Sequence, residues 1–415
     1  MKLLEALKKK ESKVLFENFI SLSLLQTVGS LLHLITLPYL LRVLGFSKYG
    51  MVILAFSLVA YFQSLTDYSF KVTATRDVSI FRNNIKKLSL IYSKVIIVKS
   101  IFFLISMLLI SIVVLSVPTF RSEWHIIYLA TLSLLGNVLL PEWFFQGIEK
   151  MKFITLINVG IKLFFTISVF FLIKKESDYW VYPLLNGLGV VIGGIVSQII
   201  LIRSFKLKLY VLKFRIIKNT ISSNFNIFVN QFLPLLYNNT SSFLLGTLLH
   251  PATLGVYDAL RKIVDIITML VSIISRVFFP FLNRRKDKFL IYRNLIISVS
   301  IALVAGVLSI HSVIFEYLNM SYDSAFLVLF ILSVGVFGYV LYDVYGLNYF
   351  IIRRQDKLVR NNTLMASLIG LSLSFPLISC LGIVGAAINL SFARLLMGGV
   401  LFFKWRRYFK HLPHY

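Results

Sequence analysis

The sequence predicts an all-α membrane protein that crosses the bilayer about twelve times, in two halves of six helices each. Of its 415 residues, 58% are hydrophobic and only 14% are charged, whereas a soluble domain carries about 25% charged residues. The apolar residues form long uninterrupted stretches along the whole chain. Short loops join these stretches, and the stretches are too long and too uniformly apolar for barrel strands, so helices are expected.

Twelve apolar stretches follow one another, and each is predicted to be one membrane-crossing helix. A helix crosses the hydrocarbon core in roughly 20 residues, and every stretch is close to that length or longer. The predicted spans are residues 18–41, 50–70, 93–117, 124–147, 153–173, 179–202, 221–245, 257–282, 292–314, 324–350, 362–380 and 383–403.

The basic residues indicate how the chain is oriented. The formal net charge is +26, which by itself is compatible with nucleic-acid binding. However, the basic residues lie in alternate loops: with a cytoplasmic N-terminus, 31 of the 43 Lys and Arg residues fall inside and five outside. Because loops rich in Lys and Arg stay in the cytoplasm, both termini are predicted to be cytoplasmic, with no nucleic-acid partner.

The basic inside loop of residues 203–220 divides the twelve spans into two sets of six. We therefore predict an N-terminal lobe over residues 1–205, a basic cytoplasmic linker over 206–220 and a C-terminal lobe over 221–415. Transporters with two such halves bind their substrates between the halves.

Two basic residues lie near the centres of their spans, where a charge is costly and usually functional. Lys162 is central in the fifth span, and Arg394 is central in the last span, beside the small residues Ala386, Ala387 and Ser391. Both are predicted to face a polar cavity and contact an anionic substrate. The alternative is a buried structural ion pair between helices.

The eighth span carries more charge than the others. Its pairs Asp258–Lys262 and Arg261–Asp265 are four residues apart, so each pair can meet on one helical face. Arg261 and Lys262 either contact an anionic head group or are neutralised within these pairs. Arg276 lies about two turns from the inner end, where it either reaches the membrane surface or faces the cavity.

Four acidic residues within or at the ends of spans are candidates for coupling transport to an ion gradient: Asp67, Glu142, Asp265 and Asp343. The alternative for each is a structural partnership with a basic residue. Lys94 and Lys99, at the inner end of the third span, are expected to extend their ammonium groups to the membrane surface.

The seventh span is unusually polar and contains Pro234. Its amides Asn230, Gln231 and Asn238 suit sugar hydroxyls, and hydrogen bonding between helices is the alternative. Cys380 is the single cysteine, and the sequence shows no Cys and His spacing typical of a metal site. We therefore expect no metal, no cofactor and no catalytic residue.

Three segments carry a family resemblance. They are Leu37 to Gly45 with the later Asp67-Tyr68-Ser69-Phe70 and Ala74-Thr75-Arg76-Asp77, then Pro141-Glu142-Trp143-Phe144-Phe145-Gln146-Gly147, and Tyr257-Asp258-Ala259 with Phe279-Pro280. These segments resemble bacterial O-antigen flippases, the Wzx-type polysaccharide transporters of the multidrug/oligosaccharidyl-lipid/polysaccharide (MOP) exporter superfamily. The Trp-Phe-Phe-Gln-Gly segment is the most specific part of the likeness.

The resemblance implies two lobes around a central cationic cavity, in the cytoplasmic (inner) membrane of a bacterium. It implies that an undecaprenyl-diphosphate-linked oligosaccharide, for O-antigen or a related surface polysaccharide, moves from the inner to the outer leaflet by alternating access. Coupling to a proton or sodium gradient, as in an antiporter, is a family-level expectation. Membrane lipid and other membrane proteins of polysaccharide assembly are the further partners that it implies.

Two other functions are compatible with a polytopic membrane protein. One is another exporter of the same superfamily that carries drugs or lipids. The other is an O-antigen polymerase or ligase, a membrane glycosyltransferase, which is expected to need a long outside loop for its active site. No predicted outside loop is longer than about twelve residues, so transport is favoured over catalysis.

Overall fold

The computed structural model describes the backbone of residues 2–410. It describes the side chains of residues 24–407, except at Ser30, Asn226, Asn230, Leu233, Pro234, Tyr237, Asn238, Val277 and Pro280. The described residues form helices and turns, with no strand among them. The α-helices are α1 (Lys2–Asp67), α2 (Phe70–Phe81), α3 (Ile85–Ser116), α4 (Pro118–Ser122), α5 (Trp124–Leu139), α6 (Glu142–Gly147), α7 (Met151–Leu172), α8 (Val181–Arg203), α9 (Phe214–Leu248), α10 (Pro251–Arg284), α11 (Phe289–Ser309), α12 (His311–Tyr317), α13 (Ala325–Leu341) and α14 (Asp356–Lys410). Two 3₁₀-helices, η1 (Glu176–Trp180) and η2 (Lys286–Lys288), and a π-helix, η3 (Tyr342–Ile351), complete the order.

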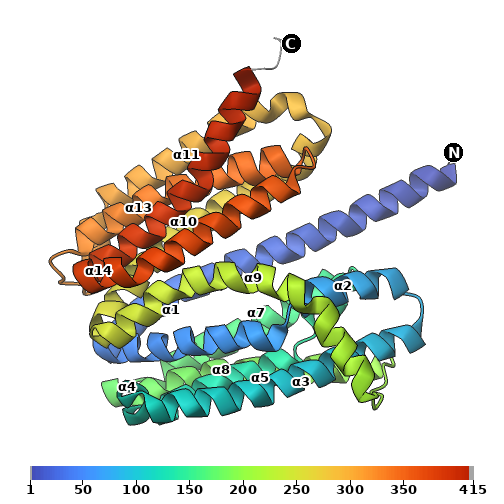
Figure 1. Cartoon of the computed structure of the whole chain (residues 1–415), viewed down its shortest axis with the longest axis horizontal. Helices are drawn as coiled ribbons and strands as arrows, with labels where there is room; N and C mark the ends of the chain where they lie inside the picture. Colours follow the sequence, from blue (N-terminus) through green and yellow to red (C-terminus); the bar gives the residue numbers. More distant parts are fainter. Residues whose placement is uncertain (1, 411–415) are drawn as a thin grey trace. The chain divides into compact units, whose positions relative to one another are not determined.

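Glycines reverse the chain within two of the longest helices. Gly45 in α1 has φ 66° and Gly382 in α14 has φ 57°, a region that glycine adopts readily because it has no Cβ. Figure 1 shows each of these helices folding back beside itself. Each therefore supplies two antiparallel helices, as predicted for spans 18–41 with 50–70 and 362–380 with 383–403.

Eight helical stretches of the described chain are long and apolar enough, by length and composition, to cross a membrane. Two of them contain α1 and α14 and supply two crossings each. Helices α9 and α10 have the necessary length, with 35 and 34 residues, but their polar and charged residues make them less apolar. Together these segments make up the twelve predicted spans, and the predicted fold class is confirmed.

The chain divides into two compact units. Unit 1 contains Met1–Leu44 and Ala55–Phe232, and unit 2 contains Gly45–Leu54 and Leu233–Tyr415. The tip of the α1 hairpin belongs to unit 2 because it packs on the start of α10: a Cβ on Gly50 would lie 1.8 Å from the carbonyl oxygen of Pro251. The boundary at Phe232 lies within α9, so the lobes and the 206–220 linker stay a prediction.

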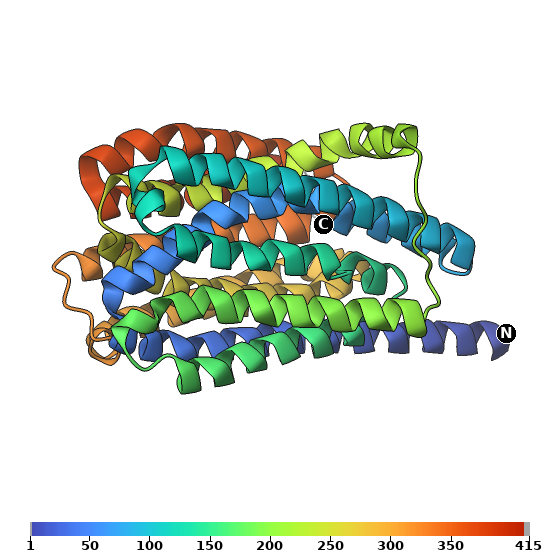
Figure 2. The ribbon, with the colours of Figure 1, turned by 90° about the horizontal axis from the view of Figure 1, so that it is seen from below.

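In unit 1, the long helices α3, α5, α7 and α8 run alongside one another (Figures 1 and 2). One end of the unit contains a buried apolar cluster to which Tyr68, Trp143, Phe144 and Phe145 all belong. The ring of Tyr68 stacks on that of Phe102, with their centroids 4.6 Å apart. The segment most specific to the family is therefore largely a packing element of unit 1.

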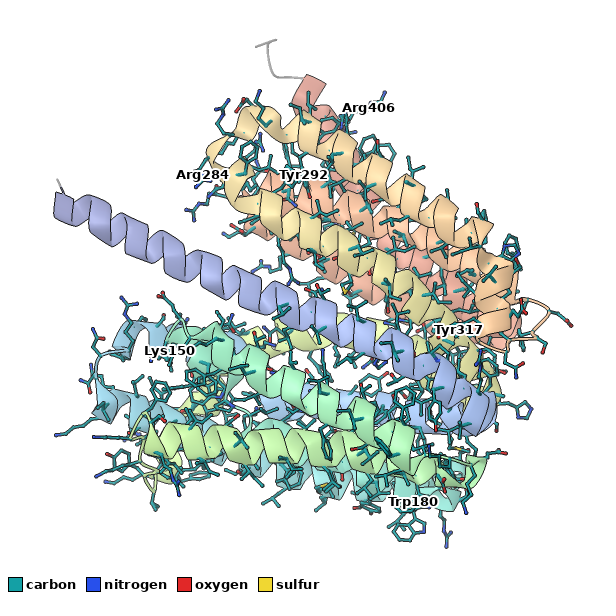
Figure 3. The ribbon with its side chains drawn as sticks, turned by 180° about the vertical axis from the view of Figure 1, so that it is seen from behind. Lys150, Trp180, Arg284, Tyr292, Tyr317 and Arg406 are labelled. Atoms are coloured by element: carbon teal, nitrogen blue, oxygen red, sulfur yellow. The ribbon has the colours of Figure 1, made fainter. Side chains whose placement is uncertain are left out.

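In unit 2, small residues bring α13 and α14 into backbone contact. A Cβ on Gly338 would lie 2.3 Å from the backbone carbon of Arg394, and a Cβ on Gly335 would lie 2.6 Å from Ser391 Oγ. Figure 3 shows Arg284 and Arg406 at one end of this unit and Tyr317 at the other. Close approach at small residues is how helices associate where no hydrophobic force between them is available.

Candidate functional site

The charged groups of unit 2 converge on Asp265 in α10. Arg394 of α14 donates a hydrogen bond to its carboxylate at 3.1 Å, and Arg261, one turn earlier in α10, lies 3.6 Å from the same carboxylate. The side chain of Arg394 is only 12% exposed and that of Asp265 is 41% exposed. The predicted pair Arg261–Asp265 is present, but its carboxylate is shared with a second arginine, Arg394.

Packing on α13 determines where Arg394 lies. Ser391 donates a hydrogen bond to the carbonyl oxygen of Ile331 at 2.7 Å, and Gly338 allows the Arg394 backbone to approach α13 closely. One guanidinium nitrogen, Nη2, binds Asp265, while the other, Nη1, is buried without a hydrogen-bond partner among the described residues. Arg394 therefore has both a structural partner and an unused donor.

A second charged group in unit 2 involves the α1 hairpin tip. Lys262 lies 2.9 Å from the carboxylate of Asp258, the other predicted i,i+4 pair. The hydroxyl of Tyr49 donates to Asp258 and accepts from Lys262, each at 2.6 Å. Because each member bonds the other two, this group reads as a structural clasp between the hairpin tip and α10.

Polar residues of α9 lie beside these charges. Ser242 lies 3.5 Å from Arg261, and Ser241 accepts a hydrogen bond from Asn389 at 3.3 Å. Of the predicted sugar-facing amides, Gln231 is exposed, while the side chains of Asn230 and Asn238 lie outside the described residues. Their role stays a prediction.

A third charged group contains Arg276, near the C-terminal end of α10, and Asp343. The charge of Arg276 acts on Asp343, which belongs to η3. Asp343 is 1% exposed and accepts a hydrogen bond from Tyr292 at 2.9 Å. Arg276 itself is exposed. Tyr339 of α13 lies between the two groups, because the charges of Asp343, Arg276 and Arg394 all act on it.

In unit 1, Lys162 lies over a glycine of α1. A Cβ on Gly29 would lie 1.8 Å from the ammonium nitrogen, so the absence of a side chain at Gly29 makes room for the lysine. No ion pair or hydrogen bond holds this ammonium group among the described residues, and Glu142 is the acidic residue whose charge acts on it. Lys162 is half-buried.

Glu142 is surrounded by donors. Asn158 of α7 donates to its carboxylate at 3.0 Å, and Lys71 of α2 lies 3.1 Å from it. Asn158 precedes Lys162 by four residues, so both lie on one face of α7. Glu142 therefore has partners, as the structural alternative for the acidic residues anticipated.

The expectation that Lys99 reaches the membrane surface is wrong. Lys99 is 3% exposed, lies 2.8 Å from the carboxylate of Asp67 and donates to the carbonyl oxygen of Asn137 at 2.7 Å. A buried ammonium is tolerated when it is paired, and Asp67 supplies that charge. Asp67 is thus also partnered, while its coupling role stays a prediction.

Sequence reasoning missed three of these partners. Neither Gly29 nor Tyr49 carries a signal that connects it to a lysine more than a hundred residues away in the sequence, and Tyr292 reads as an ordinary interfacial tyrosine.

No group of three or more His, Cys, Asp or Glu residues able to hold a metal occurs in the described part of the chain.

Comparison with known proteins is consistent with this geometry. The model of the family "Polysaccharide biosynthesis protein" matches residues 15–286. A protein of Escherichia coli K12 described as "Putative O-antigen transporter" is 27% identical over 385 residues, which cover 90% of this chain and 92% of the relative. A protein of Shigella dysenteriae with the same description is 29% identical over 195 residues, covering 46% and 47%.

Solved structures with the same fold are transporters and flippases. The lipid II flippase MurJ in an inward closed conformation aligns with a TM-score of 0.73 at 14% identity, covering 94% of this chain and 87% of that one. An inward-facing MATE multidrug transporter of the MOP superfamily aligns with a TM-score of 0.69 at 14% identity, covering 93% and 94%. At this identity the likeness establishes the fold alone.

The prediction of a membrane transporter rather than an enzyme is confirmed by the family and by the curated relatives. The family model covers well over half of the sequence. The chain therefore belongs to the polysaccharide biosynthesis protein family, as a multi-pass membrane protein with the two-lobed fold of the MOP superfamily.

Proposed function

We propose that this protein is a flippase that carries an undecaprenyl-diphosphate-linked oligosaccharide, a repeat unit of O-antigen or a related surface polysaccharide, across the inner membrane. Transport runs from the cytoplasmic to the periplasmic leaflet by alternating access, with both termini cytoplasmic. The family, the O-antigen transporters among its relatives and the fold shared with a lipid flippase support this proposal.

The observation that carries the proposal is the pair of basic groups with unused binding capacity within membrane-spanning helices. Lys162 has no ion pair, and Arg394 has one buried nitrogen without a partner, among the described residues. A diphosphate cannot enter hydrocarbon without compensation, and each sugar hydroxyl adds a further desolvation cost. Charge-assisted hydrogen bonds to phosphate oxygens replace the lost hydration.

The other basic residues of α10 have a supporting role in this proposal. Arg261 and Lys262 are paired with Asp265 and Asp258, so each contributes part of its charge to the head group. Helix α9 supplies hydroxyl and amide groups for the sugars in this proposal. The hydroxyl groups are those of Ser241 and Ser242, and the amides are those of Asn230, Gln231 and Asn238. The prenyl chain stays in the lipid throughout, and an ion gradient drives the cycle.

The test uses the native host with this gene deleted, under conditions that tolerate the block. Lipid-linked oligosaccharides are extracted, and their membrane face is assigned by their accessibility to an impermeant sugar-oxidising reagent. We expect single repeat units to accumulate on the cytoplasmic face. Wild-type protein should restore their export, whereas Lys162→Ala and Arg394→Ala should reduce it at least tenfold.

Two matched substitutions serve as controls. Lys152→Ala removes an exposed lysine at the start of the same helix as Lys162, and Arg407→Ala removes an exposed arginine near the end of α14. Both should export normally. Normal arrival of single units at the periplasmic face without the gene would overturn the flippase proposal and favour a polymerase or ligase.

A further inference from the structure

The chain between α8 and α9 is extended and is held against α3. Residues 206–213 form no helix, and Figure 2 shows this connection crossing from the end of α8 to the start of α9. The backbone amide of Lys208 donates to Ser89 Oγ at 3.1 Å. That of Tyr210 donates to Ser93 Oγ at 2.8 Å, and both serines of α3 are at most 1% exposed. The backbone of this segment therefore has a fixed course over α3 within unit 1.

Only one edge of this extended backbone is paired. Successive amides of an extended strand point to opposite sides, and those of Leu209 and Val211 have no hydrogen-bond partner among the described residues. Such unpaired groups are not tolerated in hydrocarbon. The segment also follows the membrane-crossing stretch that ends at Arg203. Both observations place it at the surface of the bilayer, at the level of the lipid head groups.

Four large apolar side chains project from this segment and from the first residue of α9. Their exposed fractions are 61% for Leu209, 39% for Tyr210, 102% for Val211 and 78% for Phe214. By contrast, Leu207 is 3% exposed and belongs to the buried apolar cluster of unit 1. Because the hydrogen bonds to α3 fix the backbone, Leu209 and Val211 cannot turn inward as Leu207 does. Apolar groups held in this way require an apolar environment outside the protein.

The same part of the chain carries uncompensated positive charge. Five basic residues are exposed: Lys206, Lys208, Lys213, Arg215 and Lys218. Their side chains form no ion pair or hydrogen bond in the part of the chain that the structure describes, whereas Arg82, just before α3, lies 3.5 Å from Glu149. No acidic residue occurs in the sequence from residue 179 to 257. The segment therefore suits a ligand with negative charge.

Apolar side chains interleaved with cations match the chemistry of an anionic phospholipid. Such a lipid presents its phosphate directly above its acyl chains, so basic side chains bind the phosphate while apolar side chains enter the acyl boundary. The general excess of Lys and Arg in inside loops accounts for the cations but not for the exposed Val211 and Phe214. An acidic peptide would offer negative charge without an apolar layer.

We propose that residues 206–218 form a binding site for an anionic phospholipid, in the leaflet that surrounds the C-terminal end of α8. Lys213 and Arg215 bind the phosphate, and an arginine can do so with two parallel hydrogen bonds. Val211 and Phe214 enter the acyl-chain boundary beside it. The bound lipid fixes the start of α9 at the membrane surface. This binding does not depend on the substrate that the protein carries, so it goes beyond the proposed function.

The full-length protein, purified in a neutral detergent, tests the site. Cys380→Ser first removes the single native cysteine, which is exposed. Val211→Cys then supplies a thiol for a bimane label whose emission reports the polarity around it. Soluble short-chain phosphatidylglycerol should shift this emission to the blue and saturate. Phosphatidylcholine of the same chain length should need at least a tenfold higher concentration for the same shift.

Matched double substitutions test the contribution of charge. Lys213→Gln with Arg215→Gln removes two charges, each worth about fivefold in affinity near an anionic lipid surface, so phosphatidylglycerol binding should weaken at least tenfold. The control is Lys404→Gln with Arg406→Gln, two exposed basic residues with the same spacing near the end of α14. This control should bind as the unsubstituted labelled protein does.

A second pair of variants tests the apolar contribution. Phe214→Ser removes a ring that is 78% exposed, so the unfolding midpoint should stay the same while phosphatidylglycerol binding weakens severalfold. Leu115→Ser removes a leucine that is 70% exposed near the other end of α3, and binding should not change. A loss of binding in Phe214→Ser without a loss of stability cannot arise from misfolding.

Three outcomes would overturn the site. They are an equal response to phosphatidylglycerol and phosphatidylcholine, undiminished binding in Lys213→Gln with Arg215→Gln, and a full emission shift with inorganic phosphate alone. A shift with poly-glutamate and with neither lipid would also reject it and would assign the surface to an acidic protein partner. None of these assays contains the lipid-linked oligosaccharide, so failure of the site leaves the proposed function intact, and the reverse also holds.

Discussion

Asp265 and Arg394 lie 129 residues apart in the sequence and are joined by a 3.1 Å hydrogen-bonded ion pair between α10 and α14. Arg261 shares the same carboxylate at 3.6 Å. One carboxylate thus serves two guanidinium groups, and the group carries a net charge of about +1. This excess charge, together with the unpartnered Nη1 of Arg394, distinguishes the group from a neutral structural ion pair.

The first prediction separates the structural and the substrate-binding roles of Arg394. Arg394→Gln leaves Asp265 with Arg261 alone and should reduce oligosaccharide export at least tenfold. Asp265→Asn should reduce the unfolding midpoint because it leaves Arg394 buried without its partner. The double variant should recover stability, since neither charge remains unpaired, but it should not recover export.

A double-mutant cycle of export and of unfolding midpoint checks this prediction. Recovery of export along with stability would mean that Arg394 serves only the fold. The exposed residue Arg407 supplies the control: Arg407→Gln should change neither quantity.

The second prediction concerns Gly29 and Lys162. A Cβ on Gly29 would lie 1.8 Å from Nζ and about 3 Å from the neighbouring carbons of Lys162. Because Nζ is the free end of a flexible side chain, Gly29→Ala should displace the ammonium group with a small effect on stability. Export should fall severalfold, toward the level of Lys162→Ala.

Gly160→Ala is the matched control for Gly29, because a Cβ at Gly160 meets nothing within 4 Å. Export by Gly160→Ala should equal that of the wild type. If Gly29→Ala exports normally while Lys162→Ala does not, the observed position of Lys162 over α1 is not the one that transport needs.

The elements most accessible to sequence reasoning are those set by local pattern. The apolar stretches predict the spans because hydrophobic length alone decides whether a helix can cross the bilayer. The pairs Asp258–Lys262 and Arg261–Asp265 are equally local, since i,i+4 spacing on one helix brings their side chains together. Both pairs form as the spacing predicts.

The partners contributed by other helices could not be predicted in this way. Its place near the inner end of a span predicts that Lys99 reaches the membrane surface, yet Asp67 and the Asn137 carbonyl oxygen hold it inside. Each of the two ion pairs of α10 also has a third member from another helix. Arg394 of α14 joins Arg261–Asp265, and Tyr49 of α1 joins Asp258–Lys262. Only the packing of the helices brings these residues to the pairs. Tertiary contacts of this kind depend on shape rather than on spacing.

The third prediction concerns the role of Tyr49. Tyr49→Phe removes two 2.6 Å hydrogen bonds, to Asp258 and from Lys262, and leaves their direct ion pair in place. The loss should destabilise the protein by about 1–3 kcal/mol, measured as a lower unfolding midpoint in detergent. Export should fall only in proportion to the amount of folded protein.

Tyr39→Phe is a control that also removes a tyrosine hydroxyl bond, here a partly buried bond of 2.6 Å to the carbonyl oxygen of Ile173 in unit 1. It should destabilise the protein by a similar amount without involving Asp258 or Lys262. A large loss of export per folded molecule in Tyr49→Phe, absent in Tyr39→Phe, would assign Tyr49 a direct role in transport.

The fourth prediction concerns the contact between α13 and α14 that positions Arg394. A Cβ on Gly338 would lie 2.3 Å from backbone atoms of both Arg394 and Leu395. Backbone cannot rotate aside as a side chain end can, so Gly338→Ala must separate the helices. Such overpacking costs about 1–3 kcal/mol, more than the roughly 1 kcal/mol that alanine gains over glycine within a helix.

Gly399→Ala in α14 provides the opposite case, because a Cβ there meets nothing within 4 Å. It retains the gain in helix propensity without a clash, so its unfolding midpoint should equal or exceed that of the wild type. Gly338→Ala should lower the midpoint and also reduce export per folded molecule, since moving α14 shifts Arg394 away from Asp265. Equal midpoints for the two variants would show that α13 and α14 are not in backbone contact, and the position of Arg394 would then need another explanation.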